Sequence, residues 1–486
     1  MLRYTGFTQP IPVPGREMTR DASGRRLSSG GVLGGALHTL GYFSTEVCLG
    51  SPPRKFDLIV DTGSSITAVP CSSCRSCGEH MCGSSGRFDL DASRTAEAVR
   101  CPRRPVPSLK CEPCRSNECG YSVRYTEGSI IRGRVVTDVA HFQRTQGETG
   151  SSNESVRVYF GCQTMESGMF QRQRADGILG LQSSRVHAKV PSMLSMLVSR
   201  KQAPNAFSLC LADRTGLFLL GGTPPQSSQG GALTVPFERG ARALFSLNVV
   251  QISWSAHNGS SKSSTPVGGF SAAALHPTIV DSGTTFMYAS TPVQHALLAT
   301  IRKFLPRPEA GGRLCAYISP HELNALPWLY MRFNEPKRQA LEVRPSQYMV
   351  EFPKKTAGKV GKHYCAAIFD NGRDGTVIGA SIMRHREAIF DLQSAAITFV
   401  DSDCEAATPR SSRMVGAYSF ASCPSSRSAR NTTANRRLTH PRQTGGSPPV
   451  AFQRKASKVA GLTTRASLAA ANSGRWASHL AQQWVG

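Results

Sequence analysis

Two short stretches of the chain carry the residue types that acid–base chemistry needs, and they match each other position by position. The first is Asp61-Thr62-Gly63-Ser64-Ser65, within FDLIVDTGSSITAVP. The second is Asp281-Ser282-Gly283-Thr284-Thr285, within HPTIVDSGTTFMYAS. In each stretch an apolar, β-branched run leads to the aspartate, and the following glycine permits a sharp turn. A buried aspartate needs hydrogen bonds or a partner that shares its proton, so the two copies indicate a paired-carboxylate site.

The alternative is a pair of unrelated turns, since one Asp-x-Gly turn suits the end of a strand without any catalytic role. Two complete copies argue against it, because an apolar-Gly element follows each one further along the chain. These elements are Asp176-Gly177-Ile178-Leu179-Gly180-Leu181 and Thr376-Val377-Ile378-Gly379. The pattern therefore favours two related halves that bring their aspartates together.

With these motifs in this order, residues 41–404 resemble the pepsin-like aspartic peptidases. Three further stretches keep the family order: GYFSTEVCLGSPP, the flap-like Tyr125-Thr126-Glu127-Gly128-Ser129, and Leu326-Pro327 with RPSQYMV. The resemblance implies an all-β, bilobal fold in which Asp61 and Asp281 form the catalytic dyad. Two apolar patterns outside the motifs, VPSMLSMLVSR and TPVQHALLATIRKFL, have helical spacing.

The family's matching positions also imply roles for the residues beside each aspartate. Thr62 and Ser282 would brace the two loops across the lobe interface, with Gly63 and Gly283 forming the turns. Ser64 and Thr284 would hydrogen-bond the outer carboxylate oxygens. Simple turn capping by these hydroxyl groups is the alternative, and it is compatible with the same roles.

The chemistry expected of such a dyad needs neither a cofactor nor a metal. One carboxylate takes a proton from water, while the other, as a carboxylic acid, hydrogen-bonds the carbonyl oxygen of the peptide. Two carboxylates about 3 Å apart cannot both ionise, so one pKa falls and the other rises. The pair titrates as a unit, and neither residue is assigned alone as the base.

The chain has 486 residues and a net charge of +25. We expect a lead or prosegment remnant at 1–40, an N-terminal lobe at 41–222, a C-terminal lobe at 223–404 and a basic disordered tail at 405–486. The tail holds 12 Lys/Arg against one acid, scattered among small polar residues without interleaved aromatics. This composition favours a solvated tail over a nucleic-acid-binding or membrane-binding one.

Fifteen cysteines indicate an oxidising compartment. Eight of them lie in an insert at 71–119: Cys71, Cys74, Cys77, Cys82, Cys101, Cys111, Cys114 and Cys119. Zinc binding by the CxxC pairs is the alternative, but eight thiols exceed one tetrahedral site and the spacing between the pairs is too long for common ribbons. We expect disulfides among them, although eight cysteines allow about 105 pairings.

The Cys-rich insert resembles that of the nepenthesin branch of the family, and in particular that of the plasmepsin V group. This resemblance implies two further disulfides, Cys315–Cys365 in the C-terminal lobe and Cys210–Cys404 between the lobes. Because the cysteine count is odd, one remains unpaired, and we expect it to be Cys423 in the tail.

The cysteines place the chain in the lumen of the secretory pathway, the endoplasmic reticulum or Golgi. Three glycosylation sequons, at Asn153, Asn258 and Asn431, are compatible with that location. The first twenty residues lack the apolar core of a signal peptide. No stretch is long and apolar enough for a membrane anchor.

The flap hairpin, at 121–139, is where substrate specificity is expected. Tyr125 would cover the scissile bond, and Ala68 replaces the tryptophan that usually holds this tyrosine, so other contacts must hold the flap. In the plasmepsin V group a flap glutamate and a glutamine read a substrate arginine, and Glu127, beside Gly128, and Gln173 occupy those places. A solvated surface charge is the alternative for Glu127.

The sequence therefore predicts a monomeric aspartic endopeptidase of protein substrates, and the resemblance to the plasmepsin V group implies cleavage at an Arg-x-Leu-like motif. Two alternatives remain: a broad-specificity aspartic protease, and a non-catalytic pepsin-like binding protein. The chain has no HExxH motif and no GxSxG context around Ser64, which disfavours metalloprotease and serine-hydrolase chemistry.

Overall fold

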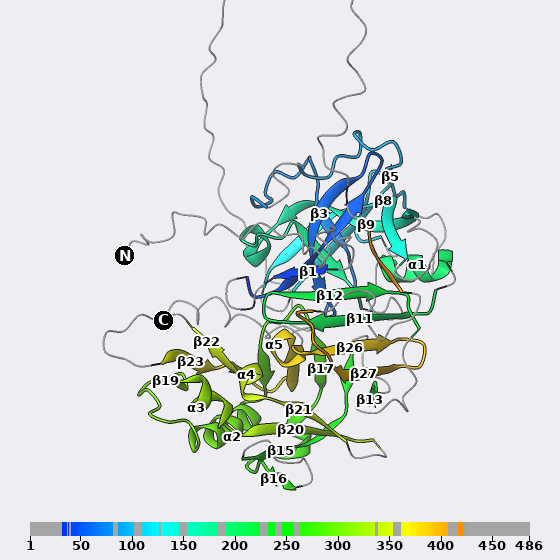
Figure 1. Ribbon diagram of the computed structural model, residues 1–486. Coiled ribbons are helices and arrows are strands. Elements are labelled where there is room, and N and C mark those ends of the chain that lie inside the picture. Colours follow the sequence, from blue (N-terminus) through cyan, green and yellow to red (C-terminus); the bar gives the residue numbers. More distant parts are fainter. Residues whose placement is uncertain are drawn as a thin grey trace, which may run out of the picture.

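The protein folds into two β-rich lobes, with long strands running between them (Figure 1). This computed structural model describes residues 32–423 except 36, 38–39, 81–85, 102–108, 110, 126–127, 145–152, 183–189, 202, 224–231, 239–244, 257–262, 336–338, 353–360, 407–416 and 422. Strands dominate and the helices are short, so the expected all-β, bilobal fold is confirmed.

The largest sheet has sixteen strands and takes them from both halves of the chain. Its main order is β13-β27-β26-β11-β12-β1-β2-β3-β10-β4-β9-β8-β7-β6, with β5 and β28 paired beside it. The bounds are β1 Val32–Gly35, β2 Phe43–Leu49, β3 Arg54–Asp61, β4 Ala68–Pro70, β5 Glu97–Ala98, β6 Cys114–Arg115, β7 Glu118–Arg124, β8 Ile130–Arg144, β9 Asn153–Glu166, β10 Gly177–Gly180, β11 Ala206–Leu211, β12 Thr215–Leu220, β13 Ala232–Pro236, β26 Arg386–Asp391, β27 Ala396–Asp401 and β28 Tyr418–Phe420.

Three smaller sheets build the C-terminal lobe. The first, ordered β14-β17-β25-β18-β24, comprises β14 Ser246–Leu247, β17 Thr278–Asp281, β25 Thr376–Gly379, β18 Met287–Ala289 and β24 Ile368–Asp370. The second comprises β16 Thr265–Pro266, β15 Val249–Ser255, β20 Trp328–Phe333 and β21 Ala340–Val343. The third comprises β19 Cys315–Ile318, β23 Lys362–Ala366 and β22 Met349–Glu351.

The two helices expected from apolar periodicity are both present. They are α1, Met193–Lys201, and α2, Thr291–Arg302, and each turns its apolar side chains into the core. The shorter helices are α3 Pro320–Asn324, α4 Pro345–Tyr348, α5 Ala380–Met383 and the 3₁₀ turns η2 Gly168–Gln171 and η4 Ala272–Leu275. Within the described residues, none of the helices combines the length and apolar character needed to cross a membrane.

The two halves repeat one arrangement around each aspartate. Strand β3 runs parallel to β10 with Asp61 opposite Gly180. Strand β17 runs parallel to β25 with Asp281 opposite Gly379. In both halves the strand that follows the motif also pairs with the apolar-Gly strand. The apolar-Gly elements therefore support the aspartate-bearing strands from behind, as the repeated sequence pattern predicts.

Seven disulfides join the described cysteines. Both pairs implied by the resemblance, Cys210–Cys404 and Cys315–Cys365, are confirmed. Three more lie within the insert: Cys74–Cys77, Cys101–Cys114 and Cys111–Cys119. Cys71 instead leaves the insert and pairs with Cys162 in β9. Cys82 lies outside the described residues, so the expectation that it is disulfide-bonded stays a prediction for that residue.

The interpretation of Cys423 as the unpaired cysteine is wrong, because Cys423 is bonded to Cys48 in β2. The expected tail boundary is wrong as well, since β28 lies beyond residue 404, is buried, and pairs with β8 and β12. Likewise β1 lies within the expected lead and pairs with β2 and β12. Strands of three or four residues are too short to show a periodic pattern in the sequence.

Candidate active site

Both aspartates lie at the ends of their strands, and each accepts the same two kinds of hydrogen bond. The Gly63 N–H donates to Asp61 Oδ1 at 2.7 Å, and Ser64 Oγ donates to Oδ2 at 2.7 Å. In the other lobe the Gly283 N–H donates to Asp281 Oδ1 at 2.9 Å, and Thr284 Oγ1 donates to Oδ2 at 2.7 Å. Each carboxylate is thereby fixed at both oxygens.

Four hydrogen bonds between Thr62 and Ser282 and the opposite strands brace the two motifs against each other. Thr62 Oγ1 donates to the Val280 carbonyl at 3.1 Å and accepts from the Ser282 N–H at 2.9 Å. In return, Ser282 Oγ donates to the Val60 carbonyl at 2.7 Å and accepts from the Thr62 N–H at 3.1 Å. Thr62 and Ser282 are buried. This reciprocal pattern fixes the lobes at the level of the aspartates.

The two motif glycines are required because each loop passes directly against the aspartate of the other lobe. A methyl group added at Gly63 would lie 2.8 Å from the carboxylate oxygens of Asp281. A methyl group at Gly283 would overlap the Asp61 carboxylate in the same way. Only a residue without Cβ lets the two carboxyl groups approach each other this closely.

The environment of the pair favours a shared proton. Burial raises the pKa of Asp61 well above its usual value, and the neighbouring charge of Asp281 raises it further. Hydrogen bonds from Ser64 and the Gly63 N–H act in the opposite direction, because they stabilise the ionised form. The raised pKa of Asp61 favours a proton held by the pair, which one carboxyl group can donate while the other accepts.

The flap rests on the segment that follows β9. The Tyr125 ring packs 4.8 Å from the Phe170 ring, which supplies the contact expected in place of the absent tryptophan. Ser129 Oγ accepts from the Met169 N–H at 2.9 Å. Gly128 adopts a left-handed φ of +94° and donates to the Tyr125 carbonyl at 3.0 Å, closing the turn. Thr126 and the predicted recognition residue Glu127 lie outside the described residues.

Gln173 lies at the end of the same segment and is half-buried. Its N–H donates to the Met169 carbonyl at 2.9 Å, and its side-chain Nε2 donates to the Ala175 carbonyl at 3.3 Å. The backbone carbonyl oxygen of Gln173 lies 3.2 Å from Nδ1 of His80 in the Cys-rich insert. His80 and its partner Glu166 were not singled out from the sequence, because an isolated histidine in a Cys-rich loop carries no motif.

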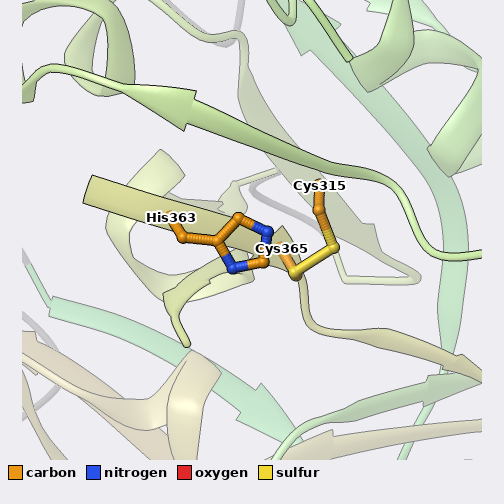
Figure 2. Close-up of side chains that lie close together, drawn as sticks. All are labelled: Cys315, His363 and Cys365. Atoms are coloured by element: carbon orange, nitrogen blue, oxygen red, sulfur yellow. A yellow bond between two sulfur atoms is a disulfide. The ribbon is translucent and has the colours of Figure 1, made fainter. Parts of the chain in front are cut away.

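One group of possible metal ligands occurs within the described residues, namely Cys315, His363 and Cys365. Figure 2 shows that the two sulfur atoms are bonded to each other beside the imidazole ring. Zinc binds thiolates, and a disulfide offers none. The ring nitrogens of His363 lie 3.1 Å from the Phe352 carbonyl and 3.2 Å from Glu309 Oε2. These contacts account for the histidine without a metal.

Two models of known protein families together match most of the chain. Residues 43–222 match the family model described as "Xylanase inhibitor N-terminal", and residues 262–401 match "Xylanase inhibitor C-terminal". Aspartic protease 5 of Toxoplasma gondii is 24% identical over 405 residues, 76% of this chain and 37% of the relative.

Two other relatives carry related names. Plasmepsin V of Plasmodium falciparum is 30% identical over 195 residues, 39% of this chain and 31% of the relative. Aspartic proteinase 39 of Arabidopsis thaliana is 24% identical over 403 residues, 78% of each chain. The matched part of the chain thus spans about a third of the length of the two protozoan relatives. With its two matched halves, its repeated motifs and its bilobal fold, the chain belongs to the pepsin-like aspartic protease family.

Proposed function

We propose that this chain is an aspartic endopeptidase that cleaves protein substrates with a water molecule activated by Asp61 and Asp281. One observation carries the proposal. The two aspartates accept equivalent hydrogen bonds from the glycine and hydroxyl residues beside them, and hydrogen bonds of Thr62 and Ser282 connect the two motifs. A binding protein would have no need for two adjoining carboxylates, one buried and one half-buried, since their desolvation costs free energy.

The mechanism follows from the shared proton. The ionised carboxylate takes a proton from water as the oxygen attacks the peptide carbonyl, and the protonated carboxyl donates a hydrogen bond to the carbonyl oxygen. Proton transfer to the leaving nitrogen then completes cleavage. The hydrogen bonds from Ser64 and Thr284 keep both carboxylates oriented during these steps.

The proposed specificity is for an Arg-x-Leu-like motif, with Tyr125 and Gly128 of the flap covering the substrate and Glu127 facing its arginine. Gln173 would contribute from the body of the lobe, since its segment directly supports the flap. A carboxylate and an amide facing a guanidinium give charge-assisted, directional hydrogen bonds. The printed name Aspartic protease 5 supports the protease activity, whereas the preference for arginine is proposed from Glu127 and Gln173.

We also propose that the enzyme acts as a monomer in the lumen of the secretory pathway. Seven disulfides support this location, because such bonds persist in oxidising compartments. Alkylation of the native protein followed by non-reducing mass spectrometry would report the oxidised pairs. Recovery of most cysteines as free thiols from the native source would refute the location.

The catalytic proposal is tested by Asp61→Asn and Asp281→Asn, each assayed for peptide hydrolysis with and without a statine-type inhibitor. Both variants should lose turnover, since asparagine cannot exchange the shared proton, while near-UV circular dichroism stays unchanged. Hydrolysis near the wild-type rate by either variant would reject the dyad. A wild-type protein that binds the inhibitor but cleaves nothing in a peptide library would instead indicate a binding protein.

The specificity proposal is tested with an Arg-x-Leu peptide and a matched peptide carrying alanine in place of arginine. Glu127→Ala should lower kcat/KM for the first peptide about a hundredfold or more, because losing one partner of a desolvated charge pair costs about 2–5 kcal/mol. Gln173→Ala should cause a smaller loss, since a neutral amide contributes less. If Glu127→Ala slows both peptides equally, Glu127 shapes the flap and does not read arginine.

A further inference from the structure

A buried contact between a histidine and a glutamate connects the Cys-rich insert to the end of β9, the strand that leads to the flap-supporting segment. His80 Nε2 lies 2.9 Å from Glu166 Oε2, and the two side chains are 0% and 1% exposed. The other ring nitrogen, Nδ1, lies 3.2 Å from the carbonyl oxygen of Gln173. One imidazole thus bridges a carboxylate and the backbone of the residue proposed to help bind arginine.

The Gln173 carbonyl and an ionised Glu166 can only accept hydrogen bonds, and with these partners one protonation state of His80 suits the site. A neutral imidazole has one N–H, so it can satisfy only one of the two acceptors, whereas an imidazolium donates to both. Glu166 Oε2 also accepts from the Gly78 N–H at 3.0 Å, as expected of a carboxylate. Its Oε1 is buried without a hydrogen-bond partner among the described residues. Loss of the His80 proton would therefore leave a poorly satisfied buried carboxylate.

The segment between Glu166 and Gln173 is held from both sides. On one side it carries the flap, through Phe170 against Tyr125 and the hydrogen bond of Met169 to Ser129.

On the other side the insert packs against it. Gln171 Nε2 donates to the Ser76 carbonyl at 2.8 Å, and Ser76 pairs with Met165 in a β-bridge. A side chain at Gly78 would overlap the carbonyl oxygen of Gln171. A shift of the insert at His80 would therefore move the support of the flap and the backbone of Gln173 together.

We infer that His80 and Glu166 are positioning residues for the substrate-arginine subsite, and that the imidazolium form of His80 holds Gln173 and the flap support in the binding position. This inference rests on the proposed function, because it assigns the pair to the subsite proposed there. It makes recognition of arginine dependent on pH, separately from the protonation of the catalytic aspartates.

The charges around His80 agree with this role. Burial lowers the pKa of the ring, but the hydrogen bond and charge of Glu166, the hydrogen bond to the Gln173 carbonyl and the charge of Asp176 together outweigh it and raise the pKa above the ordinary 6.5. Tyr121, in β7, is a further titratable group near Glu166, and burial keeps its pKa well above the usual value, so it stays neutral. The imidazolium form of His80, which bridges the two acceptors, is fully present below pH 6.5 and is lost as pH rises through the raised pKa of His80.

The test compares kcat/KM for the Arg-x-Leu peptide and its alanine counterpart from about pH 5.5 to about pH 9. The ratio of the two values cancels the titration of the aspartate pair, which acts on both peptides. In the wild-type enzyme the ratio should fall about tenfold as His80 deprotonates, the effect of one displaced hydrogen-bonding group. A ratio that stays constant across this range would overturn the inference.

Three variants sharpen the test. His80→Gln should give a low ratio at every pH, because a glutamine has donors on one nitrogen only and cannot bridge both acceptors. Glu166→Gln keeps the shape but removes the charge, so the pH at which the ratio falls should move downward. His363→Gln is the matched control: His363 also bridges a carboxylate and a carbonyl, but in the C-terminal lobe, and its loss should leave the ratio unchanged.

A second readout does not depend on cleavage. In ¹⁵N-histidine-labelled full-length protein, the signals lost in His80→Gln identify the His80 ring, and their shifts report whether both nitrogens are protonated. Two protonated nitrogens at pH 6.5 support the bridge even if the enzyme shows no preference for arginine, which would reject the proposed function alone. A singly protonated ring at that pH overturns the inference whatever the substrate.

Discussion

Replacing Thr62 by valine tests whether the reciprocal bonds between the lobes hold the aspartates in position. The change keeps the β-branched shape but removes the hydroxyl group, which donates to the Val280 carbonyl at 3.1 Å and accepts from the Ser282 N–H at 2.9 Å. Both partners would remain buried without these bonds. Each orphaned group costs about 1–3 kcal/mol, so the free energy of unfolding should fall by about 2–6 kcal/mol.

The loss of activity should exceed the loss that the unfolded fraction of the protein alone would explain. A small displacement of one aspartate loop relative to the other should lower kcat about a hundredfold, whereas KM should change little because the flap and outer subsites are untouched. The assays are urea unfolding with disulfides intact and steady-state hydrolysis of one peptide. Ser282→Ala should behave similarly, and the double variant should lose less than the sum, because both hydroxyl groups brace one interface.

A matched control is Thr234→Val, which breaks a single hydroxyl–hydroxyl contact of 3.0 Å with Thr398 between β13 and β27. It should reduce stability slightly and leave kcat unchanged. The reasoning fails if Thr62→Val retains the wild-type kcat, or if Thr234→Val lowers kcat as much as Thr62→Val does.

The remaining predictions concern a turn, a disulfide and a helix cap. Gly63→Ala should lower kcat/KM about a hundredfold with an unchanged circular dichroism spectrum, because the methyl group would displace the opposite carboxylate; a normal rate would rule out the close approach. Cys423→Ser removes the bond to β2 and should lower the unfolding free energy by about 2–5 kcal/mol, seen as an earlier urea midpoint. Hydrogen bonds from the backbone of Ser319 and from Arg307 lower the pKa of Glu322 to about 2, so its stabilisation is present above pH 4.5 and lost toward pH 2. Glu322→Gln should flatten the dependence of Tm on pH in that window, and an unaltered slope would contradict this.

The features that sequence predicted best are those built from contiguous residues. The aspartate motifs and the apolar-Gly strands each carry their own pattern, and the structure pairs Asp61 with Gly180 and Asp281 with Gly379 in the same register. Helix α2 was predictable for the same reason, since its apolar spacing lies within twelve residues.

The features that sequence missed depend on partners far apart in the chain. The disulfide between Cys48 and Cys423 spans 375 residues, and nothing near either cysteine indicates the other. The contact between Tyr125 and Phe170 holds the flap where Ala68 offers no aromatic ring, and only the folded chain reveals it. His80 is a similar case, because the contact that suggests its role is with Glu166, 86 residues later in the chain.

The bond between Cys48 and Cys423 also sets an order for the biogenesis of the protein. During synthesis Cys48 leaves the ribosome 375 residues before its partner, roughly 20–75 s earlier at about 5–20 residues per second. In the oxidising lumen proposed above, strand β2 would carry an unpaired thiol during this interval, and the insert cysteines could pair with it. Correct pairing requires either rapid burial of Cys48, which is 1% exposed in the finished fold, or repair of mixed pairs by a disulfide isomerase. Yield in recombinant expression should thus depend on isomerase capacity more than on the rate of oxidation.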